Sequence, residues 1–527
     1  MKRFKGFFAC LLLVSFMFVS LAACRNQSNQ SRDGGGTISL AWYINFSWFG
    51  RPDKNNAVHQ KILADTGVDI DFIIPAGNES ERLNSMIASN TLPDLITLGW
   101  WEPQIRELID AGMIWALDDL ANQYAPQFWT VADEGRLGWY RSDDGKVYQY
   151  PNASYSPADY EKYDNISANN AFMVRKDIYE AIGSPDMTTP EGFVKAIRDA
   201  VAYAPSINGR TLIPFGCFEF TDNGNASFDT LMDFLAIPRE DANGNIVDRR
   251  LNPEYVRWLK AFRELGAGGY LHDDIFIDQR AQMSEKMAQG RYFAILYQHT
   301  DIRQEQQLLF SENPETVFLA IDGPKNSRGS PHTLGAVGIS GWTVTMIPKT
   351  SRNPARAIQL MAYLMGVEAQ KLISFGPEGV GYDMIDGRPV ERPEIRNLRL
   401  NNASEYGRTI GGSDGYWMLM DTALMNQWAE PEEPPMKQLI EWGYPYSVST
   451  SEYSFFLAFD SEESNIALRV NNRWGSILPR LLLARTDAEF DDIYRQFVDF
   501  SRAQNYDKVL AEQTRQLKLN KEKLGIR

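Results

Sequence analysis

Early in the chain, short apolar segments alternate with amphipathic ones, and this alternation constrains the fold more than any other feature. Segments 38–44, 68–74 and 95–98 have the apolar runs or the strict alternation expected of strands. Segments 59–66 and 83–87, which lie between them, carry apolar residues at helical spacing. Strands separated by helices need crossover connections, so they lie parallel in one sheet. The sequence therefore predicts an α/β fold with a largely parallel sheet.

Later in the chain, helix start signals become frequent. Three of them combine a side-chain oxygen at the N-cap with a proline at the first helical position, where its missing N–H costs nothing. These are Thr189-Pro190, Asn252-Pro253 and Asn353-Pro354. Thr486 and Glu489 form a capping box that begins a further helix. We expect the C-terminal part to be mainly helical.

The size and cysteine content of the chain bear on how it is stabilised. Its 527 residues exceed what one hydrophobic core usually serves, so two lobes are expected. A hydrophobic content of 44% argues against disorder. Cys10 and Cys24 lie near the N-terminus, and only Cys217 lies in the body. No disulfide can form between cysteines of the body, so its core must stabilise it.

The N-terminus has the three parts of a secretory signal peptide over residues 1–23: a basic start, a short apolar run and small residues at the end. Its last residues with Cys24, Leu-Ala-Ala-Cys, resemble a bacterial lipobox, which predicts that Cys24 is lipidated. Residues 24–36 have the polar composition of a flexible tether. An ordinary cleaved signal peptide and an uncleaved anchor helix remain alternatives.

The charge of the chain limits its partners. The formal net charge is −15, and removal of the signal peptide with its three basic residues makes it −18. Such a surface repels nucleic acid and offers no basic face to acidic lipids. It does not exclude an anionic sugar, because a local basic pocket can exist on an acidic surface.

A series of short motifs runs through nearly the whole chain after the tether. The motifs include Pro93-Asp94-Leu95-Ile96, Gly290-Arg291-Tyr292-Phe293-Ala294, Gly341-Trp342-Thr343, Asn353-Pro354-Ala355-Arg356-Ala357 and Gly376-Pro377-Glu378-Gly379-Val380-Gly381-Tyr382. Each motif alone is weak, but their order and spacing resemble family 1 of the extracellular solute-binding proteins of ABC importers. The long form of the chain is similar to LipO/YtcQ-like lipoproteins and, more distantly, to alginate-binding proteins.

The resemblance implies a two-lobed periplasmic-binding-protein-like fold of type II, with a ligand cleft between the lobes. Residues 37–164 and 318–375 are expected to form the first lobe. Residues 165–317 and 376–527, with the helical C-terminal part, are expected to form the second. The implied protein is a lipid-anchored monomer on the extracellular face of the membrane. It would bind an oligosaccharide and deliver it to ABC permease subunits.

Candidate sugar contacts follow from chemistry and position. Sugar rings stack their C–H faces on aromatic rings, and their hydroxyls bond to planar polar groups. The cleft of a doubly wound domain lies beyond the carboxyl ends of its strands. Trp48 and Phe49 fall in the loop after the first strand. The predicted ligand-binding residues are Trp42, Tyr43, Trp100, Trp101, Asn152, Tyr297, Trp342, Glu378 and Tyr382.

Most of the 13 tryptophans are expected in the core, and Trp258, at helical spacing, is one of these. Trp100 and Trp101 are adjacent in an extended segment, so their side chains cannot both point inward. One of the two is therefore expected to face solvent or the cleft.

Enzyme signals are weak. Residues 411–415 spell Gly-x-Ser-x-Gly, but the polar segment 401–409 before them is not the buried strand that a nucleophile elbow needs. The four histidines have no paired metal spacing. The sequence therefore predicts a binding protein without catalytic residues. A polysaccharide-degrading enzyme and a sugar-sensing or adhesive lipoprotein remain alternatives.

The spacing of Asp241, Asn243 and Asn245 copies the first half of a calcium-binding loop. The glycine is not at the sixth position, and the twelfth residue is Asn252 rather than glutamate. Asn243-Gly244 instead favours a type I′ hairpin turn. The sequence thus predicts no cofactor, with calcium as the alternative.

Overall fold

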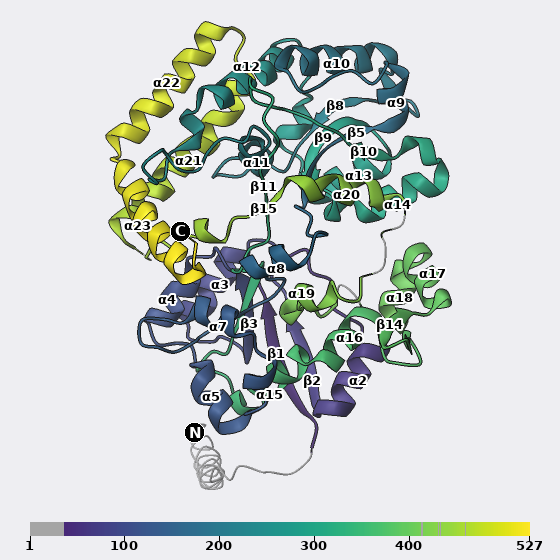
Figure 1. The fold of residues 1–527 in the computed structure, drawn as a ribbon, viewed down its shortest axis with the longest axis vertical. Coiled ribbons are helices and arrows are strands. Elements are labelled where there is room, and N and C mark those ends of the chain that lie inside the picture. Colours follow the sequence, from purple (N-terminus) through teal and green to yellow (C-terminus); the bar gives the residue numbers. More distant parts are fainter. Residues whose placement is uncertain (1–35, 413–414, 430–431, 433, 459, 527) are drawn as a thin grey trace, which may run out of the picture. The chain divides into compact units, whose positions relative to one another are not determined.

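The computed structural model describes residues 36–526, apart from 413–414, 430–431, 433 and 459. The predicted signal peptide, Cys24 and almost the whole tether lie outside the described residues, as does Ser413 of the Gly-x-Ser-x-Gly segment. From Ser39 onward the chain forms one compact unit, which contains two separate main sheets (Figure 1).

The sheet of the first lobe has the strand order β2-β1-β3-β12-β4. β1 and β3 are parallel, with Trp42 opposite Leu95, and β12 is antiparallel to both β3 and β4. Thr343, the first residue of β12, lies opposite Gly99, the last of β3, so these ends share one edge of the sheet. The strands are β1 (Ile38–Ile44), β2 (Val68–Ile73), β3 (Leu95–Gly99), β4 (Tyr150–Pro151) and β12 (Thr343–Met346).

The sheet of the second lobe has the order β10-β5-β9-β8, with β8 and β9 parallel and β5 antiparallel to its neighbours. The first lobe was expected to resume at residue 318, but β10 begins there and pairs with β5 instead. This short apolar strand completes the edge of the second sheet. The strands are β5 (Asn170–Arg175), β8 (Ile213–Gly216), β9 (Tyr292–Gln298) and β10 (Phe318–Ala320).

Helices cover both sheets, which is why strands such as β3 are buried along their whole length. The helices in and around the first lobe are α2 (Ala57–Thr66), α3 (Glu79–Ala88), α4 (Gln104–Asp110), α5 (Leu117–Tyr124), α6 (Phe128–Val131), α7 (Glu134–Tyr140), α8 (Pro157–Lys162), α15 (Pro354–Met365), α16 (Val367–Phe375), α17 (Pro393–Asn401), α18 (Ala403–Thr409) and α19 (Thr422–Met425). The hairpin of β13 (Tyr382–Ile385) and β14 (Arg388–Glu391) precedes α17.

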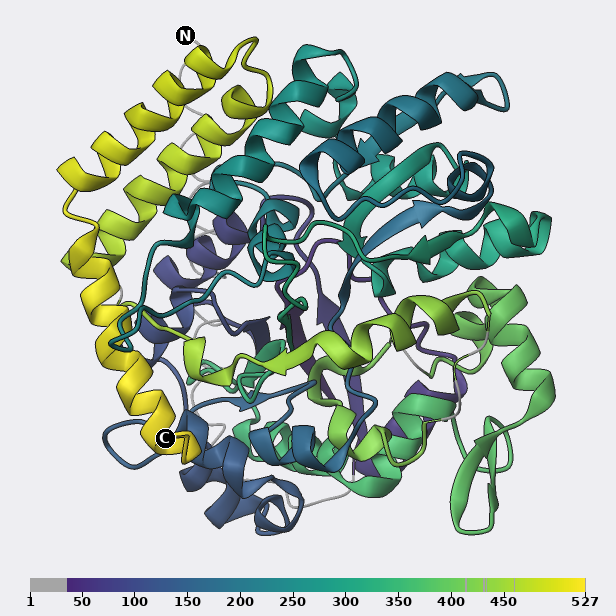
Figure 2. The same ribbon diagram turned by 45° about the horizontal axis from the view of Figure 1, so that its top comes forward.

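The second lobe is mainly helical toward the C-terminus, as expected. In Figures 1 and 2 the long helices α21 and α22 run side by side, and α23 continues the chain beyond them. The helices of this lobe are α9 (Lys176–Ala181), α10 (Pro190–Tyr203), α11 (Ala226–Phe234), α12 (Pro253–Ala267), α13 (Arg280–Ala288), α14 (Arg303–Glu312), α20 (Met436–Gly443), α21 (Glu462–Leu482), α22 (Asp487–Ala503) and α23 (Asp507–Leu524).

The helix start signals act as their chemistry predicts. Thr189, Asn252 and Thr486 are N-caps whose side chains accept backbone N–H groups at the start of α10, α12 and α22. α15 also begins at the predicted proline, although Asn353 makes no side-chain capping bond. In the predicted capping box, the Glu489 carboxylate accepts from the N–H of Arg485, one residue before the cap.

The segment that follows residue 376 differs from the prediction. It was expected in the second lobe, yet Val58 N–H of α2 donates to the Ile410 carbonyl at 3.0 Å. Gln370 Nε2 of α16 donates to the Leu419 carbonyl, also at 3.0 Å. The chain up to Leu419 therefore packs on the first lobe before it returns to the second.

Segments that pass between the lobes are tied to each other. The Asn152 side chain accepts from Thr343 N–H at 2.7 Å and donates to the Trp417 carbonyl at 2.8 Å. Tyr155 N–H donates to the Gly338 carbonyl. Farther on, β11 (Leu334–Ala336) pairs in parallel with β15 (Ser447–Ser449). The chain thus crosses between the lobes in several adjacent segments.

Candidate functional site

Four aromatic side chains form a cluster at the edge of the first sheet, and we call Phe46, Trp48, Trp342 and Trp417 the tryptophan cluster. Trp48 is stacked on Trp342, with ring centroids 5.8 Å apart and an interplanar angle of 12°, and on Trp417 at 5.9 Å and 23°. Trp342 and Trp417 are 4.5 Å apart, and Phe46 contacts all three tryptophans. Trp48 is 45% exposed, whereas Trp417 is buried. The cluster therefore presents one supported indole ring to solvent.

The strand topology explains why these rings meet. Phe46 and Trp48 follow the end of β1, and Trp342 immediately precedes β12. Because β12 is antiparallel to β3, its beginning lies beside the end of β3, where Trp100 N–H approaches the Trp342 carbonyl at 3.4 Å. The site thus lies beyond the carboxyl ends of the parallel strands, where ligands of α/β sheets generally bind.

A polar network lies at the same edge. Tyr43 hydroxyl donates to Asn45 Oδ1 at 2.6 Å, and Asn45 Nδ2 donates to Glu102 Oε2 at 2.6 Å. Glu102 Oε1 accepts from Gly99 N–H at 2.8 Å. Burial raises the pKa of Glu102 to about 7, and the charge of Glu79 adds to this, although the two hydrogen bonds oppose it. The network holds a carboxyl that titrates near neutral pH.

The second lobe contributes charged residues to the tryptophan cluster. The guanidinium of Arg280, the first residue of α13, lies over the Trp48 ring at 5.3 Å from its centroid. Arg280 also forms an ion pair with Asp301, which follows β9 in the chain, at 3.0 Å. Burial raises the pKa of Asp301, and the positive charge of Arg280 opposes this. Arg280 therefore connects the two lobes.

Tyr297 and Glu219 lie near this ion pair. Tyr297, in β9, packs on Phe218 with ring centroids 4.2 Å apart, and the charges of Asp301, Arg280 and Glu219 all act on its hydroxyl. Glu219 follows β8, and its buried Oε2 has no hydrogen-bond partner among the described residues. An unpaired buried carboxylate oxygen is costly unless something else bonds to it. Within the described chain, Glu219 therefore retains an unused buried acceptor oxygen near this ion pair.

The predicted contacts occupy different environments. Trp342 belongs to the tryptophan cluster. Trp101 is 52% exposed and Trp100 is half-buried, with its ring edge-on to those of Trp101 and Phe456. Trp42 and Tyr43 are fully buried, because helices cover both faces of the sheet. The Trp42 indole N–H donates to Thr97 Oγ1. The Tyr43 hydroxyl is connected to the polar network by its hydrogen bond to Asn45.

Three further predicted contacts are Asn152, Tyr382 and Glu378; the first two are buried and the third is exposed outside the tryptophan cluster. Asn152 is buried and uses both ends of its side chain on backbone groups. Tyr382 is buried against Phe375, with ring centroids 5.8 Å apart. Glu378 is exposed in the turn before β13.

Some residues in and around the tryptophan cluster were outside the predicted set. Trp48 lies in the loop after β1. The rule that ligands bind beyond the carboxyl ends of parallel strands could have selected it. Trp417 is far along the chain and lies at the first lobe because the segment after residue 376 packs there. No local sequence pattern predicts this packing. Arg280 begins a helix, and Glu219 follows a short strand with no other signal of function.

The residues of the predicted calcium alternative form a turn that is hydrogen-bonded to itself. Asp241 Oδ1 accepts from the N–H groups of Asn243 and Asn245, and from Asn245 Nδ2. Asn252, the twelfth residue, caps α12. Among the described residues no group of three or more His, Cys, Asp or Glu side chains could hold a metal ion. The donor set therefore does not fit a calcium loop of this type.

The turn itself differs from the expected type I′. Gly244 N–H donates to the Asp241 carbonyl, one residue earlier than a two-residue Asn-Gly turn requires, and Gly244 has a φ of 75°. Asp241 N–H donates to the Asn245 carbonyl. These bonds are typical of a type I turn followed by a glycine bulge.

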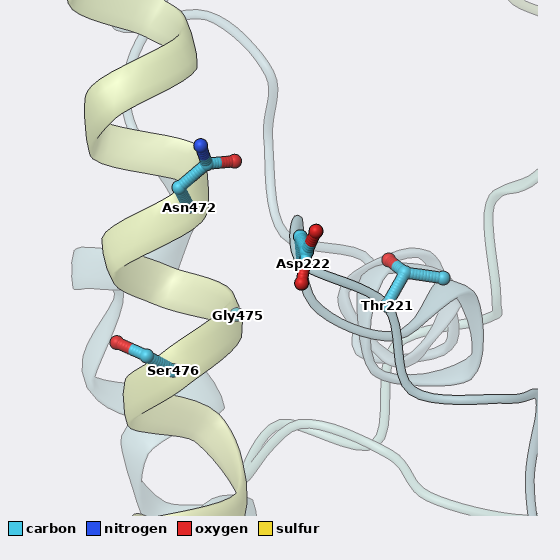
Figure 3. Close-up of a pocket in the computed structure, with 5 residues that line it drawn as sticks. All are labelled: Thr221, Asp222, Asn472, Gly475 and Ser476. Carbon is cyan, nitrogen blue, oxygen red and sulfur yellow. The ribbon is translucent and has the colours of Figure 1, made fainter. Parts of the chain in front are cut away.

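Two pockets lie in the second lobe, away from the tryptophan cluster. The first has a volume of about 310 Å³, and Figure 3 shows its lining between the loop at Asp222 and helix α21. The second, of about 300 Å³, lies around Asp229, Arg250 and Trp474. Trp474, which lines the second pocket, is buried. Neither pocket is lined by an aromatic ring as exposed as that of Trp48.

In the described part of the chain, no helix combines the length and the apolar character needed to cross a membrane.

Comparison with known proteins places the chain in a family. Residues 52–371 match the family described as bacterial extracellular solute-binding protein. A fructooligosaccharide ABC transporter substrate-binding protein, FusA of Streptococcus pneumoniae, is 24% identical over 295 residues. This match covers 52% of the chain and 54% of FusA, so it spans about half the length of that relative.

Solved structures share the fold. The alginate-binding protein AlgQ2, in a crystal structure without calcium ion, has a TM-score of 0.67 at 17% identity, covering 92% of this chain and 98% of AlgQ2. FusA of S. pneumoniae in complex with kestose has a TM-score of 0.66 at 17% identity, covering 92% and 100%. These neighbours confirm the predicted two-lobed periplasmic-binding-protein-like fold.

Proposed function

The chain belongs to the family of bacterial extracellular solute-binding proteins, and from this premise we propose that it binds a neutral oligosaccharide between its lobes and delivers it to an ABC importer. The family and the neighbours are substrate-binding proteins rather than enzymes. FusA, as its name states, serves fructooligosaccharides, and AlgQ2 is an alginate-binding protein, which supports a sugar as the ligand here.

The observation that carries the proposal is the exposed ring of Trp48. It is backed by Trp342 and Trp417. Glu79 accepts from the N–H of Ser47, next to Trp48. Asp301 pairs with Arg280, which lies over the ring. A sugar ring gains from stacking its C–H face on such an indole, and its hydroxyls gain from carboxylate acceptors. Of the predicted contacts, we propose that Trp342, Trp100 and Trp101 extend this surface, while Trp42, Tyr43 and Asn152 support it from within.

The charges at the cluster favour a neutral sugar. Acidic groups linked to it include Glu79, which accepts from Ser47 N–H, Glu102, which accepts from Asn45, and Asp301, which pairs with Arg280. Arg280 is the cation over Trp48, and Asp301 already balances its charge. A uronate would add a further negative charge to a site with an excess of carboxylates, which costs free energy. Neutral oligosaccharides meet no such repulsion.

Further parts of the proposal concern the chain outside this site. We propose that Cys24 is lipidated after export, so that the protein acts as a monomer anchored to the extracellular face of the cell membrane. Permease subunits in that membrane would receive the sugar. One structural neighbour is a FusA EF-hand mutant, but the closed turn at Asp241 supports sugar binding without calcium in this chain.

The test is calorimetric titration of the chain from residue 25 onward with matched neutral and uronic oligosaccharides, while the mixtures are assayed for cleavage. We expect micromolar or tighter binding of a neutral sugar, which is recovered intact. Trp48→Ala should weaken this binding at least about tenfold, or about 1.4 kcal/mol. The matched control is Trp129→Ala, which changes a ring of similar exposure in α6. Absence of binding across the panel would refute the proposal, and cleavage would redirect it to an enzyme.

A further inference from the structure

Arg280 makes a contact that binding of a sugar must break. Its guanidinium lies over the Trp48 ring, although Arg280 belongs to the second lobe and Trp48 to the first. Trp342 and Trp417 are already stacked along Trp48, which is 45% exposed. A sugar that stacks on Trp48 would share this remaining ring surface with Arg280.

We infer that Arg280 is an internal competitor for the Trp48 ring: its guanidinium lies over the ring that a sugar would stack on, and the sugar must displace it. This inference rests on the proposed function and identifies a residue that sets its affinity. A planar guanidinium suits the role, because it stacks on aromatic faces and is weakly hydrated.

When Arg280 is displaced from Trp48, its side chain keeps its ion pair with Asp301. Asp301 binds it at 3.0 Å and is itself largely buried, so Asp301 stays in place when Arg280 moves. Glu219, whose Oε2 lacks a partner among the described residues, is close enough for its charge to act on Asp301. Only the contact with Trp48 is then lost when a sugar enters. At a partly exposed site such a contact changes affinity by about two- to fivefold.

The first test is titration of Arg280→Ala with each neutral sugar that the wild-type protein binds. We expect affinity to increase about two- to fivefold, by the same factor for every sugar that stacks on Trp48, because the lost competition is common to all. Arg198→Ala is the matched control: Arg198 also pairs with a carboxylate, that of Glu264, and lies over a ring, that of Tyr270, but within the second lobe. Weaker binding by Arg280→Ala would overturn the inference, since it would make Arg280 a sugar contact.

A second test needs no sugar. Unfolding of the ligand-free wild-type protein, Arg280→Ala, Trp48→Ala and the double variant forms a double-mutant cycle. We expect the double variant to lose less stability than the sum of the two single losses, because both remove the same contact. Arg280→Lys keeps a positive charge for Asp301 but presents a compact ammonium, so it controls for the loss of that ion pair.

The two tests separate the inference from the proposed function. Strictly additive losses in the cycle would overturn the contact itself, whether or not any sugar binds. If the cycle shows coupling but no sugar binds to the wild-type protein, the proposed function fails and so does the competition derived from it, while the contact between the lobes stands.

Discussion

At the scale of single residues, the same side chain serves different purposes according to its distance from a strand end. Trp42 lies within β1, is covered on both faces of the sheet and satisfies its indole N–H with Thr97. Trp48, six residues later, has left the strand and is 45% exposed. Here the exposed aromatic ring therefore comes from the loop just beyond the strand, and the strand itself is buried.

Glu102 provides a prediction about pH. Its pKa is raised from 4.5 to about 7, so the folded state holds the proton more tightly than the unfolded chain does. This stabilisation is fully present below pH 4.5 and is lost as pH rises through about 7. We expect Glu102→Gln to remove a decline in the free energy of unfolding on the order of 1–3 kcal/mol between these pH values. Chemical denaturation across the range measures it, with the exposed Glu522→Gln as control; equal pH profiles for all three proteins would contradict the assignment.

Asn152 provides a prediction about the crossing segments. Asn152→Ala leaves the Thr343 N–H and the Trp417 carbonyl without their buried partner. Each unsatisfied group costs about 1–3 kcal/mol, so a loss of roughly 2–4 kcal/mol in the free energy of unfolding is expected. Urea denaturation measures the loss, and Asn401→Ala, at an exposed helix end, should change stability by less than about 0.5 kcal/mol. A neutral Asn152→Ala would show that water replaces these bonds.

At the scale of elements, local signals were sufficient where the physics is local. β1 was predicted with the bounds observed, and the Pro-containing helix starts of α10, α12 and α15 are correct, because alternation and capping act over a few residues. Pairing partners were not predictable in this way. β10 joins the second sheet, and the chain up to Leu419 packs on the first lobe, through contacts between residues far apart in sequence. The sequence therefore predicted only part of the tryptophan cluster.

Gly341 lies where two crossing segments meet, immediately before Trp342. Its φ is 72°, and a Cβ at this position would lie 2.2 Å from the Asn152 carbonyl oxygen. Gly341→Ala must therefore move the backbone, and we expect a loss of about 2–4 kcal/mol in unfolding free energy together with weaker sugar binding.

The matched control for Gly341→Ala is Gly387→Ala in the β13–β14 hairpin. Gly387 has a similar φ of 78°, but nothing lies within 4 Å of an added Cβ. Its loss should be limited to the cost of the left-handed conformation, about 1 kcal/mol. Thermal unfolding and calorimetric titration of both variants separate strain from steric conflict. Equal losses would mean that the approach to Asn152 relaxes without cost.

The turn at Asp241 provides a prediction about metal removal. Because its carboxylate accepts N–H groups of the turn itself, we expect neither added calcium nor a chelator to shift the unfolding midpoint by more than about 1 °C, since a ligand stabilises only the state that binds it. Asp241→Ala should lower stability equally with and without calcium. A midpoint that rises with calcium and is lost in Asp241→Ala would restore the calcium alternative.

At the scale of the whole molecule, the two sheets are separate hydrophobic bodies connected by adjacent crossing segments. Arg280 and Trp48 add a contact that is not covalent and that involves one charge already paired with Asp301. Such a contact is weak enough to open and close repeatedly. Under the proposed function, the binding energy of a sugar would favour one arrangement of the lobes without having to disrupt either core.

The excess of negative charge makes the response to salt a test of ligand class. The net charge is −15, and Glu79 and Asp301 are linked to residues of the tryptophan cluster or its neighbours, so a uronate would approach against repulsion that salt screens. A neutral sugar carries no charge to be screened, and we expect its dissociation constant to change less than about twofold between about 50 and 500 mM NaCl. A matched uronic sugar, if it binds at all, should bind more tightly at the higher salt concentration. Titrations of both sugars at the two concentrations measure this; uronate binding that weakens with salt would place an unpaired cation in the site and exclude the neutral-sugar proposal.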